Sequence, residues 1–281
     1  NELINVPILL ASIFRDVKRS DGYIDCFIEK VRPKLVITFI DNARMFYKIS
    51  QRHSKVKTMF IQNGTRSRLF EGEKPECVHG KVDYMMTFGS DIGCEYSKYI
   101  QGDSISIGSL KNNYYPISHS NALGTIAFVS QYRSKTSALI GGELVTHEKF
   151  YQADKIVLEY LAIYARKNGK KISIIPTYEF EDPLFIKEKE FYSNILGGLA
   201  NFSESRECGS YYYNTDAAEV VVGVMSTLLY ESIARGNKTA IFPIRGQLLN
   251  AIDHRYGWPG EYADNGPFWT NNPNPENFER I

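Results

Sequence analysis

Short apolar runs rich in β-branched residues alternate along the chain with longer segments of mixed polarity. Residues Lys34–Ile40 form one such run, as expected of a strand that is buried on both faces. Further strands are predicted at Val56–Ile61, Tyr84–Phe88 and Ser104–Ile107, and helices at Pro7–Val17, Tyr23–Val31, Ala43–Gln51 and Ile92–Tyr99. This alternation predicts an α/β domain with an open parallel sheet.

A polar segment, Lys111–Asn121, interrupts this rhythm and is the predicted linker. Beyond it we predict strands at Thr125–Val129, Lys171–Ile175, Glu219–Gly223 and Lys238–Phe242, helices at Lys149–Lys167, Pro183–Leu196 and Ser226–Gly236, and a polar loop at Ser130–Gly142. The fold class is therefore α/β, with two Rossmann-like parallel-sheet domains facing a cleft. The predicted domains are residues 1–115, truncated in a chain that starts with Asn, and residues 122–281. Ligands of such sheets bind outside the carboxyl ends of the strands.

The strongest local signal is the buried strand at Val220–Gly223 that runs into a helix opening at Ser226. The free N–H groups and the positive dipole end of such a helix suit a phosphate or carboxylate. Ser226 and Thr227 add hydroxyl donors, and Glu231 can reach a sugar or ribose hydroxyl. The plainer alternative is a capping serine and a solvated acid, since such caps are common.

This stretch, Ser-Thr-Leu-Leu-Tyr-Glu followed by Ala-Arg-Gly-Asn-Lys, resembles the donor-side motif of GT-B glycosyltransferases that build bacterial surface polysaccharides such as O-antigen and capsule. CDP-glycerol glycerophosphotransferases carry a similar element. The resemblance implies that Ser226 and Thr227 bind the donor phosphate and that Glu231 holds the ribose or sugar of the donor. The motif spans about 25 residues, and the rest of the likeness lies at the level of the two-domain fold.

Two further loops of the second domain agree with this resemblance. The stretch Thr125–Ser134 resembles the first strand and loop of a GT-B C-terminal domain, where a Ser or Gly approaches the phosphates of the donor. The turn Pro176–Glu179 follows the next strand, where such enzymes contact the nucleotide base. The donor candidates on these loops are Ser130, Gln131, Arg133, Tyr178 and Glu179. Ordinary polar loops are the alternative.

In the first domain, the sequence Gln-Asn-Gly-Thr-Arg after a predicted strand resembles the Gln-Asn-Gly or Gln-His-Gly turn of the same transferases. The glycine permits a tight turn and leaves polar groups at the edge of the sheet. The acceptor-binding candidates are Asn63, Gly64, Thr65 and Arg66. A plain turn is the alternative, because Asn-Gly is a common turn dipeptide.

Two carboxylates follow strands of the first domain and are candidates for the catalytic residue. Asp41 is favoured as the base that deprotonates an acceptor hydroxyl, or as the nucleophile of a retaining reaction. Asp91 is the rival base. The alternative for Asp41 is that it caps the helix predicted at Ala43–Gln51.

Composition narrows the field of functions. The 33 Lys and Arg against 32 Asp and Glu give a formal net charge of +1, which argues against nucleic acid as a partner. The four cysteines form no CxxC pair, so a reducing cytoplasmic location is expected. No apolar run reaches the roughly 20 residues of a membrane helix. The sequence lacks a Walker motif, a dinucleotide fingerprint and an Asp-X-Asp pair, so no cofactor and no metal are expected.

Together these observations predict a metal-independent GT-B-like glycosyltransferase of surface carbohydrate biosynthesis. Its expected partners are a nucleotide-sugar donor, a saccharide or lipid-linked acceptor, and the inner membrane through peripheral contact. One alternative is a CDP-glycerol-type glycerophosphotransferase, and another is a non-catalytic GT-B-like module that binds saccharide. The donor sugar, its nucleotide, the acceptor and the stereochemical outcome stay open.

Overall fold

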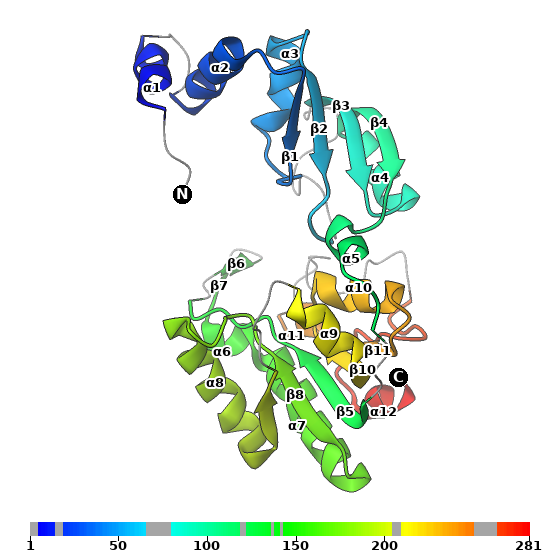
Figure 1. Cartoon of the computed structure of the whole chain (residues 1–281). Helices are drawn as coiled ribbons and strands as arrows, with labels where there is room; N and C mark the ends of the chain where they lie inside the picture. Colours follow the sequence, from blue (N-terminus) through cyan, green and yellow to red (C-terminus); the bar gives the residue numbers. More distant parts are fainter. Residues whose placement is uncertain are drawn as a thin grey trace. The chain divides into compact units, whose positions relative to one another are not determined.

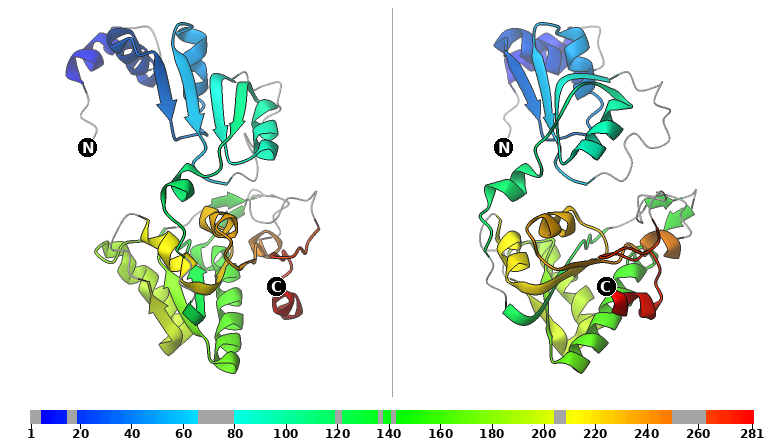
Figure 2. Two further views of the ribbon diagram at one scale, coloured as in Figure 1. Left: turned by 45° about the vertical axis from the view of Figure 1, so that its right-hand side comes forward. Right: turned by 90° about the vertical axis from the view of Figure 1, so that its right-hand side faces the viewer.

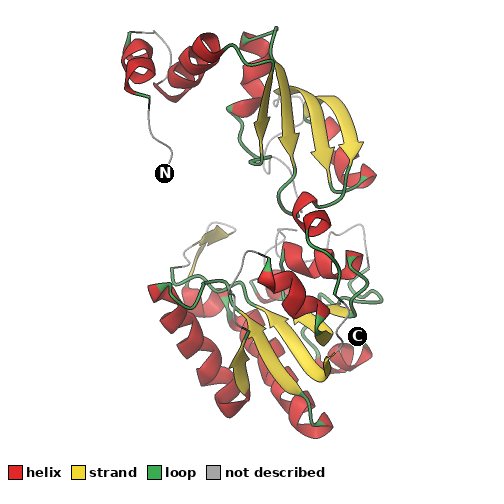
Figure 3. Cartoon of the chain, viewed as in Figure 1, coloured by secondary structure: helices red, strands yellow, loops and turns green. Residues whose placement is uncertain are grey.

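The computed structural model of the chain describes residues 5–14, 19–65, 80–118, 122–135, 138–140, 143–203, 209–249 and 263–281 (Figure 1). The chain divides into two compact units, Asn1–Asn113 and Tyr114–Ile281. The division lies within the polar segment at Lys111–Asn121 that the sequence singles out as a linker. Each unit is built around its own parallel sheet (Figure 3).

The first unit contains a parallel sheet whose spatial order follows the order of the chain. Its strands are β1 (Leu35–Thr38), β2 (Lys57–Ile61), β3 (Gly80–Thr87) and β4 (Ile100–Ser106), paired in the order β1-β2-β3-β4. Its helices are α1 (Val6–Ile13), α2 (Arg19–Val31), η1 (Phe46–Lys48), α3 (Ile49–Arg52), α4 (Ser90–Ser97) and α5 (Leu110–Tyr114). The core is formed by apolar side chains of the strands and of the segments covering them, including Phe60, Val82, Met85 and Tyr96.

The prediction of a single helix at Ala43–Gln51 is wrong, because only the short η1 and α3 form there. The residues just before them make turns, in which Ala43 N–H donates to the carbonyl of Ile40 and Phe46 N–H donates to that of Ala43. Asp41 does not cap a helix. Its carboxylate points into the interior, where it accepts a hydrogen bond from the Tyr96 hydroxyl.

The second unit contains five parallel strands, and their spatial order differs from their chain order. The strands are β5 (Ala122–Val129), β8 (Lys171–Ile175), β9 (Ala200–Phe202), β10 (Ala218–Gly223) and β11 (Thr239–Ile241), paired in the order β11-β10-β5-β8-β9. The chain builds outward from β5 in one direction and then returns to build in the other. The neighbours β5 and β10 therefore flank the topological switch point, where open α/β sheets bind ligands.

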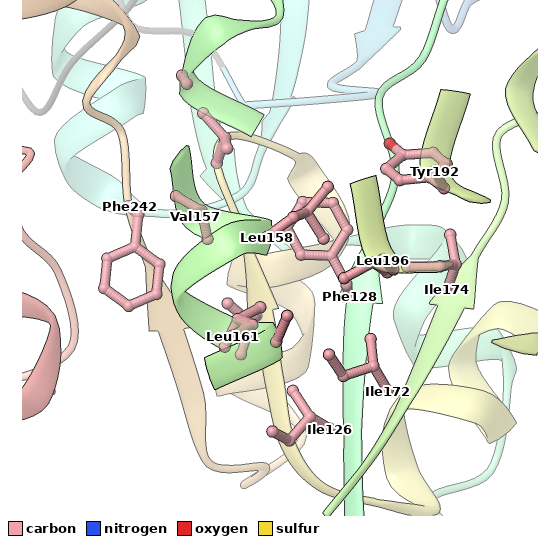
Figure 4. Packing of buried hydrophobic residues seen from close by; sticks show 14 of the residues in the cluster. Ile126, Phe128, Val157, Leu158, Leu161, Ile172, Ile174, Tyr192, Leu196 and Phe242 are labelled. Carbon is pink, nitrogen blue, oxygen red and sulfur yellow. The ribbon is translucent and has the colours of Figure 1, made fainter. Parts of the chain in front are cut away.

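Helices cover both faces of this sheet (Figure 2). They are α6 (His147–Phe150), α7 (Gln152–Asn168), α8 (Pro183–Leu196), η3 (Gly197–Leu199), α9 (Ser210–Asp216), α10 (Thr227–Ala234), α11 (Arg245–Leu248) and α12 (Pro275–Arg280). On one face, Phe128 of β5 packs against Leu158 of α7 and Tyr192 of α8 (Figure 4). On the other face, Val129 lies in a cluster with Leu229 of α10. Successive residues of a strand thus point into different cores. This explains why the strands are apolar at consecutive positions.

Some elements of the second unit are absent from the sequence-based prediction. A two-stranded antiparallel hairpin, β6 (Ala138–Ile140) and β7 (Glu143–Val145), occupies part of the predicted polar loop. The short β9 and α9 are also additional. No helix of the described residues is long and apolar enough to cross a membrane.

Candidate functional site

A cavity of about 570 Å³ opens in the second unit at the carboxyl ends of β5, β8 and β10. The strand ends and the loops after them contribute most of its wall. The lining residues are Val129, Ser130, Gln131, Arg133, Lys135, Phe150, Tyr151, Ile175, Pro176, Thr177, Tyr211, Ser226, Leu228 and Arg245. The cavity thus lies at the switch point of the sheet, the place that the fold itself favours for a ligand.

The start of α10 forms one wall of the cavity. Ser226 is the N-cap of this helix, and its hydroxyl accepts a hydrogen bond from Leu228 N–H at 3.3 Å. Gly223 ends β10 so close to the helix that a Cβ there would lie 3.0 Å from Leu229 Cδ1. The capping role considered for Ser226 is therefore present, and the same residue lines the cavity. The positive end of the helix dipole lies at this wall.

The other two candidates of this motif lie outside the set of lining residues. Thr227 is half-buried at the first position of α10. Glu231 is 7% exposed and belongs to the buried face of the helix, so it is not the solvated acid of the plainer alternative.

The cavity carries an excess of positive charge. Arg133, Lys135 and Arg245 line it, and none of the lining residues that the structure describes is acidic. A phosphate or diphosphate would meet three cations and the start of a helix here. In the described part of the chain, no group of three or more His, Cys, Asp or Glu side chains is placed to hold a metal ion.

Arg245 is a lining residue that the sequence analysis missed. It opens α11 after β11, is 4% exposed, and donates from Nη2 to Asp154 Oδ2 at 2.6 Å and from Nε to the Phe150 carbonyl at 3.1 Å. The guanidinium carbon lies 4.2 Å from the centre of the Phe150 ring. Burial raises the pKa of Asp154, and the nearby Arg245 offsets only part of that rise. The available signal was a basic residue three positions beyond the last predicted strand.

The loop after β5 is held in place by Tyr151. The Tyr151 hydroxyl accepts a hydrogen bond from Arg133 N–H at 2.7 Å and donates to the Gln131 carbonyl at 3.0 Å. The Gln131 side chain lines the cavity, and its Oε1 is buried without a hydrogen-bond donor among the described residues. Gln131 and Arg133, both predicted donor contacts, are thus brought to the cavity by a fixed backbone.

Ser130, the third candidate on this loop, has a hydroxyl that is already engaged. It donates to a carboxylate oxygen of Glu188 and accepts from the Tyr192 hydroxyl at 2.8 Å and from Tyr132 N–H at 3.1 Å. Glu188 was missed, although it has the helical spacing of the buried residues Phe185 and Tyr192 on α8.

The carboxylate of Glu188 also accepts hydrogen bonds from the turn after β8. The donors are Thr177 N–H at 2.9 Å and Tyr178 N–H at 3.0 Å. Pro176 and Thr177 line the cavity, whereas the candidates of the same turn, Tyr178 and Glu179, do not. Tyr178 packs against the core, and Glu179 is exposed.

In the first unit, the loops after β1, β2 and β3 are joined by buried hydrogen bonds. Asp41 is fully buried, and besides the Tyr96 hydroxyl its carboxylate accepts from Asn63 N–H at 3.4 Å. Gln62 accepts from Phe88 N–H and donates to the Gly64 carbonyl, both at 2.8 Å. These bonds bring the predicted Asn-Gly turn and Asp41 together.

The remaining candidates of this unit lie at its surface or beyond the described residues. The side chain of Asn63 is exposed and Thr65 is half-buried. Asp91 is exposed in the first turn of α4. Arg66, the fourth predicted acceptor contact, lies outside the residues that the structure describes.

Solved structures with the same fold include two epimerases. UDP-GlcNAc 2-epimerase from Methanocaldococcus jannaschii has a TM-score of 0.51 and 11% identity, with 93% of this chain and 74% of that chain covered. UDP-GlcNAc 2-epimerase from Neisseria meningitidis, bound to UDP-GlcNAc, has a TM-score of 0.50 and 11% identity, with 92% of this chain and 69% of that chain covered. MnaA from S. aureus with UDP has a TM-score of 0.50 and 10% identity, with 80% of this chain and 61% of that chain covered. This chain therefore spans less than two thirds of the length of MnaA. At these identities the likeness establishes the fold alone.

The predicted fold of two Rossmann-like units is thus confirmed, and it is the GT-B type that the sequence motif indicated. No curated protein matches the chain in a sequence search. One protein family does match, over residues 59–281, and its description is "putative O-antigen biosynthesis protein". Because this match covers most of the chain, the resemblance to proteins of surface-polysaccharide synthesis is confirmed. The chain belongs to this family of O-antigen biosynthesis proteins.

Proposed function

We propose that this protein is a glycosyltransferase that moves a sugar from a nucleotide-activated donor to a saccharide or lipid-linked acceptor during O-antigen biosynthesis. The observation that carries the proposal is the cavity at the switch point of the second sheet. It combines three cationic side chains, the N-cap of α10 and no acidic lining residue among those described. Such a site suits the diphosphate of a sugar nucleotide.

The chemistry requires that negative charge developing on the leaving nucleotide be stabilised. Donors fixed in place before the reaction do this best, because they need no reorganisation in the transition state. Arg245 is held by its hydrogen bonds to the Asp154 carboxylate and the Phe150 carbonyl. Ser226 is held in place as the N-cap of α10. We assign the phosphates to these two residues, with Arg133 and Lys135 at the more exposed side. In this proposal the protein supplies the charge that a metal ion supplies in other transferases.

UDP is the nucleotide to be tested first. MnaA from S. aureus was solved with UDP, and the N. meningitidis epimerase with UDP-GlcNAc. These proteins share the fold of this chain, and the ligand-binding edge of that fold is where the cavity lies. Gln131 Oε1, buried at the cavity without a donor, would accept a hydrogen bond from the base or from a sugar hydroxyl.

For the acceptor side we propose Asp91 as the base. A general base must reach the hydroxyl from which it takes a proton. Asp91 is exposed, whereas the favoured candidate from the sequence, Asp41, has no exposed surface. We assign to Asp41 the role of holding the Asn63 turn, with Asn63, Gly64, Thr65 and Arg66 as the acceptor-binding segment.

The decisive experiment is a panel of thermal unfolding measurements with UDP, CDP, GDP and CMP. A nucleotide present at 100 times its dissociation constant should raise the free energy of unfolding by about 2.7 kcal/mol. We expect a response to one nucleotide that is reduced in Ser226→Ala and Lys135→Gln and kept in Glu179→Gln, an exposed control outside the cavity. If no nucleotide stabilises the protein, the proposal fails in favour of a saccharide-binding module.

Product analysis then separates the reactions that use the same cavity. Transfer of a labelled sugar supports the proposal. Transfer of glycerol phosphate from CDP-glycerol, or inversion of the sugar without transfer, would replace the glycosyltransferase by a glycerophosphotransferase or an epimerase.

A further inference from the structure

We propose that Glu188 is a positioning residue of the donor cavity, whose ionised carboxylate fixes the loops after β5 and β8 in the geometry that binds nucleotide. This inference rests on the proposed nucleotide binding and adds a residue that does not itself line the cavity. It also predicts that nucleotide affinity depends on the charge of a group that never contacts the ligand.

The geometry places Glu188 behind both loops. The carboxylate accepts hydrogen bonds from the backbone of Thr177 and Tyr178 and from the hydroxyl of Ser130, so it joins the β8 turn to the β5 loop. Ser130 and Thr177 are lining residues of the cavity. Glu188 itself has no exposed surface. A change at its carboxylate therefore alters the walls of the cavity through these two loops and not through a direct contact with a ligand.

The hydroxyl of Ser130 has no capacity left for a donor phosphate. A serine hydroxyl has one proton and accepts two hydrogen bonds. Its proton goes to Glu188, the Tyr192 hydroxyl and Tyr132 N–H donate to its oxygen, and the Thr177 hydroxyl lies 3.2 Å from it. The predicted role of Ser130 as a direct phosphate contact is therefore replaced by a role in shaping the wall.

Glu188 forms no ion pair with a Lys or Arg among the described residues. Tyr132 on the β5 loop and Tyr192 on its own helix interact electrostatically with Glu188. Tyr132 also interacts with Tyr151, Tyr178 and Glu190, and Tyr192 also interacts with Tyr151 and Asp154. Burial keeps the pKa of the Tyr192 hydroxyl well above its ordinary value, so this group stays a donor. Burial also raises the pKa of Glu188, and hydrogen bonds from Ser130, Thr177 and Tyr178 offset part of that rise.

Glu188→Gln tests the inference because an amide supplies one acceptor oxygen where the carboxylate supplies two. In the variant an NH₂ group would face a backbone N–H of the β8 turn, and one hydrogen bond to that turn is lost. We expect the affinity for UDP, measured by calorimetry, to fall about tenfold, as for the loss of one hydrogen bond to a charged acceptor. Glu190→Gln is the matched control, because Glu190 is exposed on the same helix.

The pH dependence separates positioning from a merely structural role. Protonation of Glu188 mimics the variant, so the advantage of the wild type over Glu188→Gln should shrink as the pH falls through the raised pKa of this carboxyl. The titration of UDP is common to both proteins and cancels in the comparison. Tyr192→Phe, which removes one donor to Ser130 and keeps the ring, should also weaken UDP binding.

The outcomes are distinct. Unchanged or tighter UDP binding by a folded Glu188→Gln overturns the inference, since removing a negative charge near an anion would by itself favour binding. If Glu188→Gln does not fold, unchanged affinity in Tyr192→Phe overturns it. If the wild type binds no nucleotide at all, the proposed function fails, which is a different result from wild-type binding without dependence on Glu188.

Discussion

Arg235 and Asp216 form a two-pronged ion pair in the interior of the second unit. Arg235 donates from Nε to Asp216 Oδ1 at 2.8 Å and from Nη2 to Oδ2 at 2.5 Å. The same guanidinium donates to the carbonyls of Tyr115 at 3.2 Å and Pro116 at 2.8 Å. The end of α10 is thereby tied to the segment with which the unit begins. The arginine of the Ala-Arg-Gly-Asn-Lys motif thus has a structural role away from the cavity.

Replacing Arg235 should destabilise the second unit strongly. Arg235→Ala leaves the Asp216 carboxylate buried without its cation, and removal of one partner of a buried pair costs about 3–5 kcal/mol. The measurement is urea unfolding followed by circular dichroism. Arg166→Ala, at an exposed position of α7, is the control and should change stability by less than about 0.5 kcal/mol. Equal stability of the two variants would contradict this account of the ion pair.

The Asp216 carboxylate should make the free energy of unfolding depend on pH in the acidic range. Burial raises its pKa, but hydrogen bonds from Arg235, Ser118 N–H and Asn237 outweigh that effect, and the net pKa is lowered. Its contribution is therefore fully present above the pKa of the unfolded chain and is lost as the pH falls through the folded pKa. The stability gap between wild type and Asp216→Asn should be constant near neutral pH and shrink below about pH 4. A stability difference between the two proteins that widens as the pH falls would contradict a lowered pKa for Asp216.

The exposed cations of the cavity should affect ligand binding without affecting folding. Arg133→Gln and Lys135→Gln remove charge from side chains that line the cavity and are exposed. We expect each to weaken UDP binding by about threefold to tenfold, and more at low salt than at high salt, because exposed charges are screened. Lys187→Gln, exposed on α8 and outside the cavity, is the control. Affinity that ignores both salt and these substitutions would place the phosphates elsewhere.

Gly223 allows α10 to approach the end of β10. A Cβ at this position would lie 3.0 and 3.1 Å from the two methyl carbons of Leu229, which is fully buried. Gly223→Ala should therefore overpack the site, cost about 1–3 kcal/mol of stability and displace the start of the helix. The check is thermal unfolding with and without UDP. We expect UDP to raise the unfolding temperature of this variant less than that of the wild type. A glycine with a positive φ, such as Gly169 with 62°, would not serve as a control, because a side chain there strains the backbone. Gly198→Ala, with open space around its Cβ, is the control.

The two aspartates of the first unit should respond differently to removal of charge. Asp91→Asn should lower the rate of sugar transfer by about 100-fold or more with unchanged stability and UDP affinity, as expected for loss of a general base at an exposed site. Asp41→Asn changes a buried carboxylate that joins Tyr96 to the Asn63 turn, so it should lower stability. Steady-state kinetics combined with thermal unfolding separates the two. Full activity in Asp91→Asn would remove it from the reaction.

Local sequence determined the elements of the second unit well. The predicted strand Lys171–Ile175 and helix Pro183–Leu196 coincide with β8 and α8. The helix start at Ser226 was equally readable. In each case the signal is contained in neighbouring residues: a run of β-branched side chains, an Asp before a Pro, or a Ser before an apolar period. Such signals need no knowledge of distant parts of the chain.

The tertiary structure decided which of the polar residues belong to the cavity. The roles of Glu188 and Arg245 depend on partners far along the chain, since Glu188 meets Ser130 and Arg245 meets Asp154. The helix cap considered for Asp41 does not form, because a partner 55 residues away, the Tyr96 hydroxyl, donates to its carboxylate. Sequence periodicity thus specified where strands end and helices begin. The direction of each polar side chain depended on long-range hydrogen bonds, whose partners are set by strand order rather than by proximity in sequence.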